Sequence, residues 1–203
     1  MPDERLNLTR RALFSAPLMG LVCASVAHSA PLGTDISSAL RQRALEAMVR
    51  HRAQVKNTDL MGIVDFSRAS ATPRFHLLDL HSGQVQTLLV AHGRGSDPDH
   101  SGWLKRFSNA EGSYASSPGA YVTDDIYTGK HGRSLRLTGL DPTNDNAKPR
   151  AIVVHAAWYV SPSMVRDTGK LGRSEGCFAV AQTDLEQVLT RLGRGRMIYA
   201  DKI

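Results

Sequence analysis

Two residues from separate stretches of the chain could together carry out nucleophilic chemistry. Cys177 ends the glycine-containing run Leu171–Cys177, and His155 ends the apolar, β-prone stretch 151–155. A free thiol has a pKa of roughly 8.5, so a nucleophilic cysteine needs a neighbouring base or a positive environment. An imidazole held at a sheet edge could take the thiol proton and return it to a leaving amine. The two residues are therefore a candidate nucleophile and base.

Gly176 precedes the cysteine and would let a substrate carbonyl approach the backbone closely. The amide hydrogens around Gly176 and Cys177 could then bind an oxyanion. Each residue also has a purely structural interpretation. A histidine at a strand end is often a polar residue at a sheet rim, a lone cysteine can be a buried filler, and a glycine can simply shape a turn. Spacing alone leaves both interpretations open.

The N-terminus has the layout of an export signal. Arg10 and Arg11 precede the apolar stretch 12–27, and small residues follow at 27–30; this is the order of charged region, hydrophobic region and cleavage zone. The stretch is too short and too broken for a membrane span of roughly 20 apolar residues. We therefore predict that residues 1–30 are a signal peptide of the twin-arginine type, that the protein is periplasmic, and that no stable membrane span remains after its removal.

The remaining chain is expected to form one domain with a sizeable core. Cys23 lies within the predicted signal, so Cys177 would have no partner for an internal disulfide. We divide the rest into an N-terminal helical segment, 31–60, and a main domain, 61–203. The sequence does not reveal the oligomeric state.

The chain is basic, with a formal charge of +6 that falls to +5 without residues 1–30. A basic exported protein suggests an anionic partner, such as a wall polymer or an acidic peptide. Basic and aromatic residues do not interleave in the way that proteins use to stack bases, so we expect no nucleic-acid partner.

Hydrophobic periodicity predicts two helices, at 36–52 and 183–192. The expected caps are Asp35 or Ser37 for the first helix, and for the second the capping-box pair Thr183 and Glu186 with a stop at Gly193.

Short β-prone runs make up most of the rest. A hairpin is expected at 75–90, and the segment 92–119, rich in Gly, Ser, Asp and Pro, is either a substrate rim or a plain surface excursion. Further strands are expected at 121–123, 134–137, 151–155, 176–180 and 197–200. Strands dominate, so the pattern favours a mainly β fold: a sandwich or barrel of mixed sheets with a few peripheral helices.

From about residue 75 to residue 202 the chain resembles the YkuD-type murein L,D-transpeptidase catalytic domain. The hallmark of that family is a histidine followed at some distance by Ser-His-Gly-Cys. Here the matching residues are His155 and Ser174-Glu175-Gly176-Cys177. Upstream, Ser117-Pro118-Gly119-Ala120-Tyr121 is similar to the family's Thr-Pro-x-Gly-x-aromatic element. The hairpin at 75–90 resembles the strand pair that opens the domain.

Two positions depart from the family's pattern. Glu175 stands where most members have a second histidine, and Ala179 stands where an arginine commonly follows the cysteine by two. The interval between His155 and Cys177 is also somewhat long. These features resemble a divergent branch that carries the same Gly-Arg-Ser-Glu-Gly-Cys run, and they bear on substrate detail and oxyanion geometry.

The resemblance implies a cysteine-dependent transpeptidase that acts on peptidoglycan stem peptides and needs no cofactor. Cys177 would attack the carbonyl on the L-centre of meso-diaminopimelate and form a thioester, and His155 would activate first the sulfur and then the amine of an acceptor stem. The cross-link would be of the 3,3 type or of the 1,3 type from L-Ala to diaminopimelate, which the altered loop favours. Among the flanking residues, Tyr121 would support the oxyanion or the donor stem, Arg173 would meet a substrate carboxylate, Ser174 would orient His155 or cap the turn, and Glu175 would hold Arg173 or contact an acceptor amine.

Three other functions fit parts of the pattern. Capture of the same thioester by water would make the protein an L,D-carboxypeptidase. A non-catalytic wall-binding domain would use the basic charge alone. A metal site would draw on His92, Asp97, Asp99, His100 and His131, but their spacing matches no familiar ligand pattern, so we expect no metal.

Overall fold

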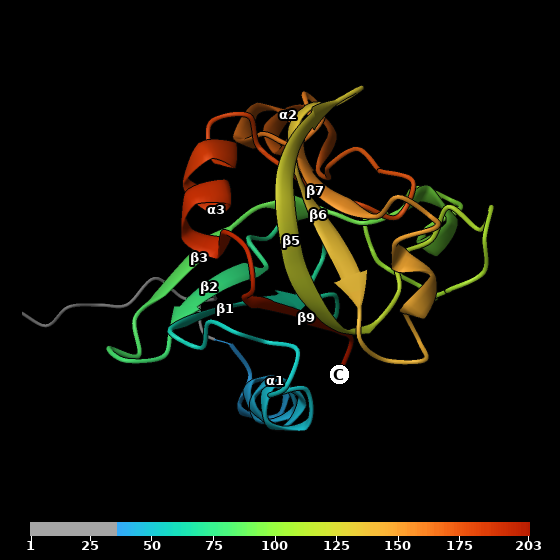
Figure 1. Ribbon diagram of the computed structural model, residues 1–203. Coiled ribbons are helices and arrows are strands. Elements are labelled where there is room, and N and C mark those ends of the chain that lie inside the picture. Colours follow the sequence, from blue (N-terminus) through green and yellow to red (C-terminus); the bar gives the residue numbers. More distant parts are fainter. Residues whose placement is uncertain (1–35) are drawn as a thin grey trace, which may run out of the picture. The chain divides into compact units, whose positions relative to one another are not determined.

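The computed structural model describes residues 36–203. The predicted signal peptide and Asp35 lie outside the described residues. Within residues 36–203, nine strands form one mixed sheet in the order β3-β2-β1-β9-β5-β6-β7-β8-β4 (Figure 1). The strands are β1 Leu60–Asp65, β2 Phe75–Asp79, β3 Val85–Leu88, β4 Val90–Ala91, β5 Gly119–Gly129, β6 Gly132–Gly139, β7 Val153–Ala156, β8 Phe178–Val180 and β9 Met197–Asp201.

The two edge strands of this sheet are neighbours in the chain. β3 ends at Leu88 and β4 begins at Val90, so Leu89 alone separates opposite edges of the sheet. The sheet must therefore curl until its edges meet near Leu89. This confirms the prediction of a mainly β sandwich or barrel with few helices. It also shows that the apolar run 85–90 is two strands, because β3 pairs with β2 whereas β4 pairs with β8.

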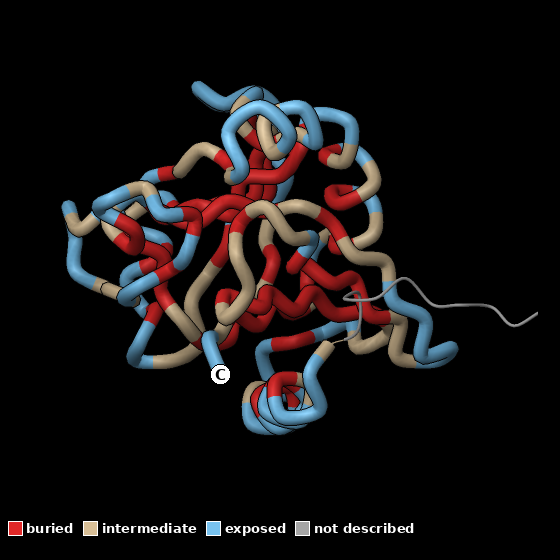
Figure 2. The backbone as a smooth tube through the Cα atoms, turned by 180° about the vertical axis from the view of Figure 1, so that it is seen from behind, coloured by how far each residue is buried: buried red, intermediate tan, exposed pale blue. Residues whose placement is uncertain are grey.

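Helix α1, Ser38–Arg50, packs against one face of the sheet. The hydroxyl of Ser37 accepts a hydrogen bond from the amide of Leu40 at 3.2 Å and caps the helix, as expected. The buried side of α1 packs on alternate residues of β1, Met61 and Ile63. Figure 2 shows the resulting pattern, in which buried residues follow the strands while the outer side of α1 is exposed.

Helix α3, Leu185–Leu192, packs on the main core with Val64 of β1. Its predicted capping box is wrong. The N-cap is Asp184, whose side chain accepts no capping bond from the helix backbone, and the Thr183 hydroxyl instead lies 3.4 Å from the Asp184 carboxylate. The helix does end at Gly193, whose amide donates to the Leu189 carbonyl at 2.9 Å.

One strand and one α-helix were not expected from the sequence. β1 is buried along its whole length and pairs with β2 on one side and β9 on the other; a strand covered on both faces lacks the alternation that marks a half-buried strand. Helix α2, Pro162–Thr168, is only two turns long, with Ser161 as its N-cap and Gly169 in the left-handed region after it. Segment 92–119 contains a 3-10 turn, η1 at Arg94–Ser96, before β5 begins.

Candidate active site

A pocket of about 160 Å³ brings together residues from four stretches of the chain. His155 and Cys177, which the sequence predicted as base and nucleophile, both line it. The other lining residues are Tyr127, Lys130 and His131 from the β5–β6 hairpin, Arg150 and Ala151 before β7, Val153 at its start, Tyr159 after it, and Ser174 and Glu175 from the loop before Cys177.

Parallel pairing of β7 with β8 explains why the two residues meet. Val154 lies opposite Phe178 and His155 opposite Ala179. Continuing this register by one residue sets Cys177 beside Val153. Because side chains alternate along a strand, Val153 and His155 point to the same face. The imidazole and the thiol therefore lie diagonally across one face of the strand pair, at the wall of the pocket.

His155 is held in the tautomer that a general base needs. Its Nδ1 lies 2.8 Å from the Ala156 carbonyl oxygen, and since a carbonyl only accepts, Nδ1 carries the hydrogen and Nε2 keeps its lone pair. Burial lowers the pKa of His155, the Ala156 contact partly opposes this, and the nearby His131 and Lys130 lower it further. The imidazole is therefore neutral at neutral pH.

Cys177 is buried, with 9% of its surface exposed. Its thiol donates to the Ala151 carbonyl oxygen at 3.6 Å rather than to His155. Burial raises the pKa of the thiol, an effect that the Val153 amide, Lys130 and Arg150 partly offset. The resting state is thus a protonated thiol and a neutral imidazole in the same pocket, and proton transfer requires the thiol to turn away from Ala151.

Ser174 and Gly176 give the loop its shape. The Ser174 hydroxyl donates to the Cys177 carbonyl at 2.7 Å and accepts from the Gly176 amide at 3.2 Å, so Ser174 closes the turn. Gly176 has φ +116°, and a Cβ there would lie 2.7 Å from the Ala115 carbonyl oxygen; no other residue type fits without strain. Because the Gly176 amide is bonded to Ser174, it does not point into the pocket as an oxyanion donor in this conformation.

The loop is fastened to segment 92–96. Ser174 forms a parallel bridge with Gly93, its amide donates to the His92 carbonyl at 3.0 Å, and its carbonyl accepts from the Arg94 amide at 2.7 Å. Gly93 permits this approach, since a Cβ there would lie 2.8 Å from the Gly176 nitrogen. The position of the cysteine loop therefore depends on the residues that anchor His92.

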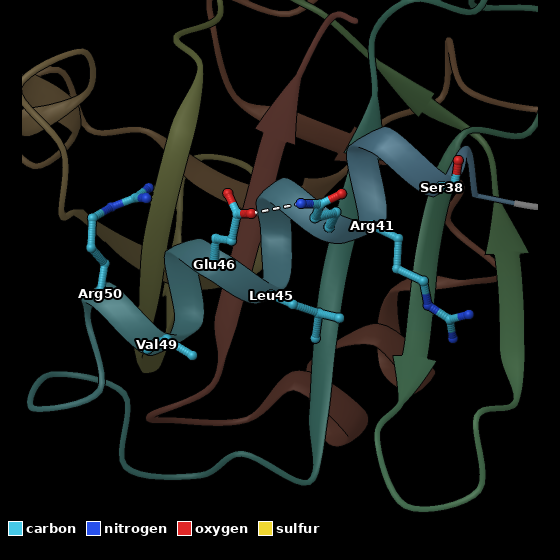
Figure 3. Close-up of a pocket in the computed structure, with 7 residues that line it drawn as sticks. Ser38, Arg41, Leu45, Glu46, Val49 and Arg50 are labelled. Carbon is cyan, nitrogen blue, oxygen red and sulfur yellow. Dashed lines mark hydrogen bonds between the residues drawn. The ribbon is translucent and has the colours of Figure 1, made fainter.

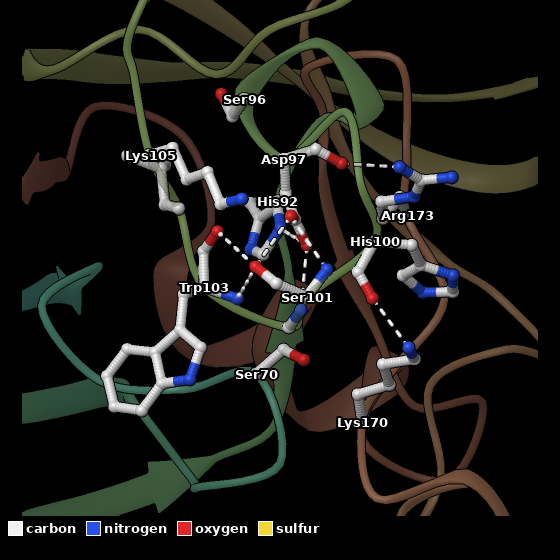
Figure 4. A network of polar contacts seen from close by, with 12 residues as sticks. Ser70, His92, Ser96, Asp97, His100, Ser101, Trp103, Lys105, Lys170 and Arg173 are labelled. Carbon is white, nitrogen blue, oxygen red and sulfur yellow. Dashed lines mark hydrogen bonds and ion pairs between the residues drawn. The ribbon is translucent and has the colours of Figure 1, made fainter.

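A buried polar network anchors His92 (Figure 4). Arg74 is fully buried and donates to the Val90 carbonyl through Nε at 3.1 Å and Nη2 at 3.0 Å, and to Nδ1 of His92 at 2.8 Å. The opposite ring nitrogen, Nε2, faces the Asp97 carboxylate at 3.4 Å. Burial and the charge of Arg74 lower the pKa of His92 to about 4. Protonating Nδ1 would break the bond from Arg74, so His92 stays neutral.

The structure also settles where the charged residues of the loop point. Arg173 donates through Nη1 to the carbonyl oxygens of Asp97 and Pro98. Glu175 pairs with Arg94, at 3.1 Å between Oε1 and Nη2, instead of holding Arg173. Of the two roles considered for Glu175, holding Arg173 is not the one seen, and contact with an acceptor amine stays a prediction.

Tyr121 lies in the hydrophobic core. Its ring is fully buried and meets Phe178 edge-on with centroids 5.3 Å apart, and its hydroxyl donates to the Ser117 carbonyl at 2.8 Å. Tyr121 therefore packs against β8 in the core and is not among the residues that line the thiol pocket.

Several pocket residues were missed by the sequence analysis. His131, considered there as a metal ligand, stacks on His155 with ring centroids 4.3 Å apart. Arg150 lines the pocket and also donates to the Ser108 carbonyl at 3.0 Å and the Ser117 hydroxyl at 2.7 Å. Burial raises the pKa of Tyr159 to about 12, with Cys177 and Glu175 adding to the effect. In the sequence, only the flanking glycines Gly129 and Gly132 indicated that Lys130 and His131 lie at the turn of a hairpin.

Of the five residues considered for a metal site, the side chains of His92 and Asp97 contact each other, whereas the other three have separate partners. Asp99 pairs with Lys105, His100 contacts the Leu171 carbonyl, and His131 stacks on His155. Among residues 36–203, no group of three or more His, Cys, Asp or Glu side chains could hold a metal ion. In the same part of the chain, no helix has the length and apolar character needed to cross a membrane.

Another hollow lies along the outer side of α1 (Figure 3). It is lined by α1 residues alone among the described ones, and Gln42 and Glu46 form a hydrogen bond of 2.9 Å across it. Leu45 and Val49 are exposed there. Because its lining includes neither a cysteine nor a histidine, the thiol pocket is the candidate active site.

Comparison with solved structures finds similar proteins at low sequence identity. An L,D-transpeptidase from Mycobacterium smegmatis has a TM-score of 0.42 and 13% identity, over 70% of this chain and 58% of that one. The helical cell shape determining protein Pgp2 from Campylobacter jejuni has a TM-score of 0.44 and 12% identity, over 72% and 49%. The chain thus spans about half to three fifths of these structures.

Comparison with curated protein sequences gives no match. The family model described as the L,D-transpeptidase catalytic domain matches residues 33–200, which is most of the chain and includes both pocket residues predicted as nucleophile and base. On this match, the chain belongs to the L,D-transpeptidase catalytic domain family.

Proposed function

We propose that the protein is a periplasmic peptidoglycan L,D-transpeptidase that uses Cys177 as nucleophile and His155 as general base. The observation that carries this proposal is that both residues line one pocket with Nε2 of His155 free to accept a proton. Membership of the family supports the reaction type. The substrate class follows from the family and from the basic charge of the chain.

In the first half-reaction, Nε2 of His155 takes the thiol proton as the sulfur attacks the carbonyl on the L-centre of meso-diaminopimelate. The tetrahedral intermediate collapses, the C–N bond breaks, and the imidazolium returns its proton to the leaving amine. A thioester on Cys177 remains. In the second half-reaction, His155 takes a proton from the acceptor amine, which attacks the thioester and releases the thiol.

The oxyanion needs a hydrogen-bond donor near the sulfur. The Gly176 amide is bonded to Ser174, so we assign this role to the hydroxyl of Tyr159, which lines the pocket and stays protonated because burial raises its pKa to about 12. Arg150, on the same pocket, adds positive charge as negative charge develops on the oxygen.

An assay with purified protein and muropeptides tests this function. We expect cross-linked dimers, whose bond type, 1,3 or 3,3, is read by tandem mass spectrometry. Trimmed monomers without dimers would replace the proposal by an L,D-carboxypeptidase, in which water captures the thioester. Wall binding without any product, unchanged in Cys177→Ala, would identify a non-catalytic wall-binding domain.

A covalent test isolates the thiol. One L,D-transpeptidase structure similar to this chain was solved in complex with imipenem, so incubation with a carbapenem should add the mass of the drug to the intact protein. The adduct should be absent in Cys177→Ala. An adduct that persists in that variant would contradict the assignment of the nucleophile.

A further inference from the structure

A second pocket lies beside the thiol pocket, on the other side of Glu175. It has a volume of about 300 Å³ and is lined by Arg94, Gly95, Pro98, Arg106, Tyr114 and Arg173. Three of these six residues are arginines, so we call it the arginine pocket. Glu175 lines the thiol pocket and pairs with Arg94 of the arginine pocket, so this one side chain links the two.

Each of the three guanidinium groups has at least one neutral partner that helps to hold it in place. Arg94 lies over the ring of Tyr114 at 3.9 Å from its centroid, and Arg106 donates through Nε to the Gly95 carbonyl at 2.9 Å. Arg173 donates to the Pro98 carbonyl at 3.1 Å. Such contacts orient a charge without cancelling it. An anion that binds here therefore meets arginines whose side-chain entropy is already reduced.

Little negative charge faces these arginines. The ion pair between Arg94 and Glu175 is exposed, with about half of each side chain open to solvent. Exposed ion pairs contribute little free energy, so Glu175 holds Arg94 only weakly. The carboxylate of Asp97 is fully buried, where it accepts from the amides of Ser101 and Gly102 at 2.8 Å and counters the charge of Arg74. The arginine pocket keeps a net positive charge.

The position of this pocket suits a peptide that is bound at the sulfur. Arg173 and Cys177 are four residues apart, so their Cα atoms are separated by at most about 14 Å. A stem peptide whose scissile carbonyl reaches Cys177 extends over a comparable length. Guanidinium groups bind carboxylates through paired N–H donors, which makes a carboxylate the ligand that fits best.

We propose that the arginine pocket binds a free carboxylate of the same peptide whose carbonyl is attacked by Cys177, and that Glu175 competes with this carboxylate for Arg94. The proposal rests on the proposed function, because that function names the peptide. It assigns a binding role to Arg94 and Arg106, and it gives Glu175 a role opposite in sign to that of the arginines.

Binding to the full-length Cys177→Ala protein tests the proposal without any turnover. The probes are a synthetic tetrapeptide stem containing meso-diaminopimelate and a set in which each carboxylate in turn is replaced by a carboxamide, measured by titration calorimetry. We expect one amidated member to bind about tenfold more weakly than the parent. Adding Arg106→Gln should weaken the parent to nearly the affinity of that member, whereas Glu175→Gln should strengthen the parent. Arg41→Gln, on the outer side of α1, is the matched control.

Three results would overturn the proposal. One is equal affinity for the parent and every amidated peptide. Another is an Arg106→Gln variant that weakens all peptides by the same factor, which indicates a structural role. The third is binding that ignores amidation but is displaced by inorganic phosphate, which indicates a phosphate-bearing ligand. If the unaltered protein gave no product from muropeptides while the Cys177→Ala protein kept its preference for the carboxylate, the proposed function alone would be refuted.

Discussion

At the scale of single residues, the environment of His155 predicts the pH dependence of the reaction. Its pKa lies below the ordinary value of 6.5, so the imidazole remains an unprotonated base until the pH falls below 6.5. We expect kcat/KM for the muropeptide reaction to be flat near neutral pH and to fall only in that lower range. A steady-state pH profile measures this.

Lys130 supplies the control for this profile. Its positive charge helps to lower the pKa of His155. In Lys130→Gln, the fall of kcat/KM at low pH, which we call the acid limb of the profile, should therefore move to higher pH. A limb that stays in place, or one that moves to lower pH, contradicts the assignment of the limb to His155.

Gly176 is the residue at which the loop tolerates least change. In Gly176→Ala the backbone would keep φ +116° with a side chain 2.7 Å from the Ala115 carbonyl oxygen, and strain of this kind costs roughly 1–3 kcal/mol. We expect a lower free energy of unfolding by denaturant and a large loss of turnover. Gly83→Ala is the matched control, since Gly83 also has positive φ but open space around it. Equal effects of the two substitutions would show that close packing at Gly176 is unimportant.

At the scale of elements, the buried network beneath the cysteine loop predicts how stability depends on pH. Unfolded His92 takes a proton near pH 6.5, whereas in the folded protein its pKa is about 4. The unfolded state therefore binds more protons between these values, and the free energy of unfolding falls as the pH falls through this window, by roughly 3 kcal/mol. Chemical denaturation at a series of pH values measures the slope.

His92→Gln should reduce that slope, because an amide can accept from Arg74 and donate to Asp97 without titrating. His81→Gln, at an exposed turn, is the comparison and should leave the slope as it is. An unchanged slope in His92→Gln would assign the pH dependence to other groups.

The elements also show what the sequence could predict. Helices α1 and α3 and the hairpin β2–β3 follow from periodicity, which is a local property. β1 was missed because it is covered on both faces, and α2 because two turns carry too little periodicity. His155 and Cys177 were found because a lone thiol and a strand-end imidazole carry chemistry in their types. His131, Arg150 and Tyr159 were missed because their place in the pocket depends on the pairing of β6 with β7 and of β7 with β8, which joins strands that are distant in the chain.

At the scale of the described domain, closure of the sheet at Leu89 links the core to the thiol pocket. β3 completes one edge of the sheet, and β4 holds β8 directly after Cys177. Inserting Gly-Gly between Leu88 and Leu89 should lower the melting temperature and, more strongly, the turnover. The same insertion between Ser82 and Gly83, in an exposed turn, should be tolerated. Equal activity of the two insertion variants would show that the junction does not position the site.

The hairpin formed by β5 and β6 carries a further consequence. Lys130 and His131 reach the thiol pocket from its tip, while the strands behind them pair independently with β9 and β7. Substitution of Lys130 and His131 would change the surroundings of His155 without disturbing the strand pairing that builds the domain. A few substitutions at this tip would therefore change the charge and the ring contact beside His155 while the sheet that carries it stays intact.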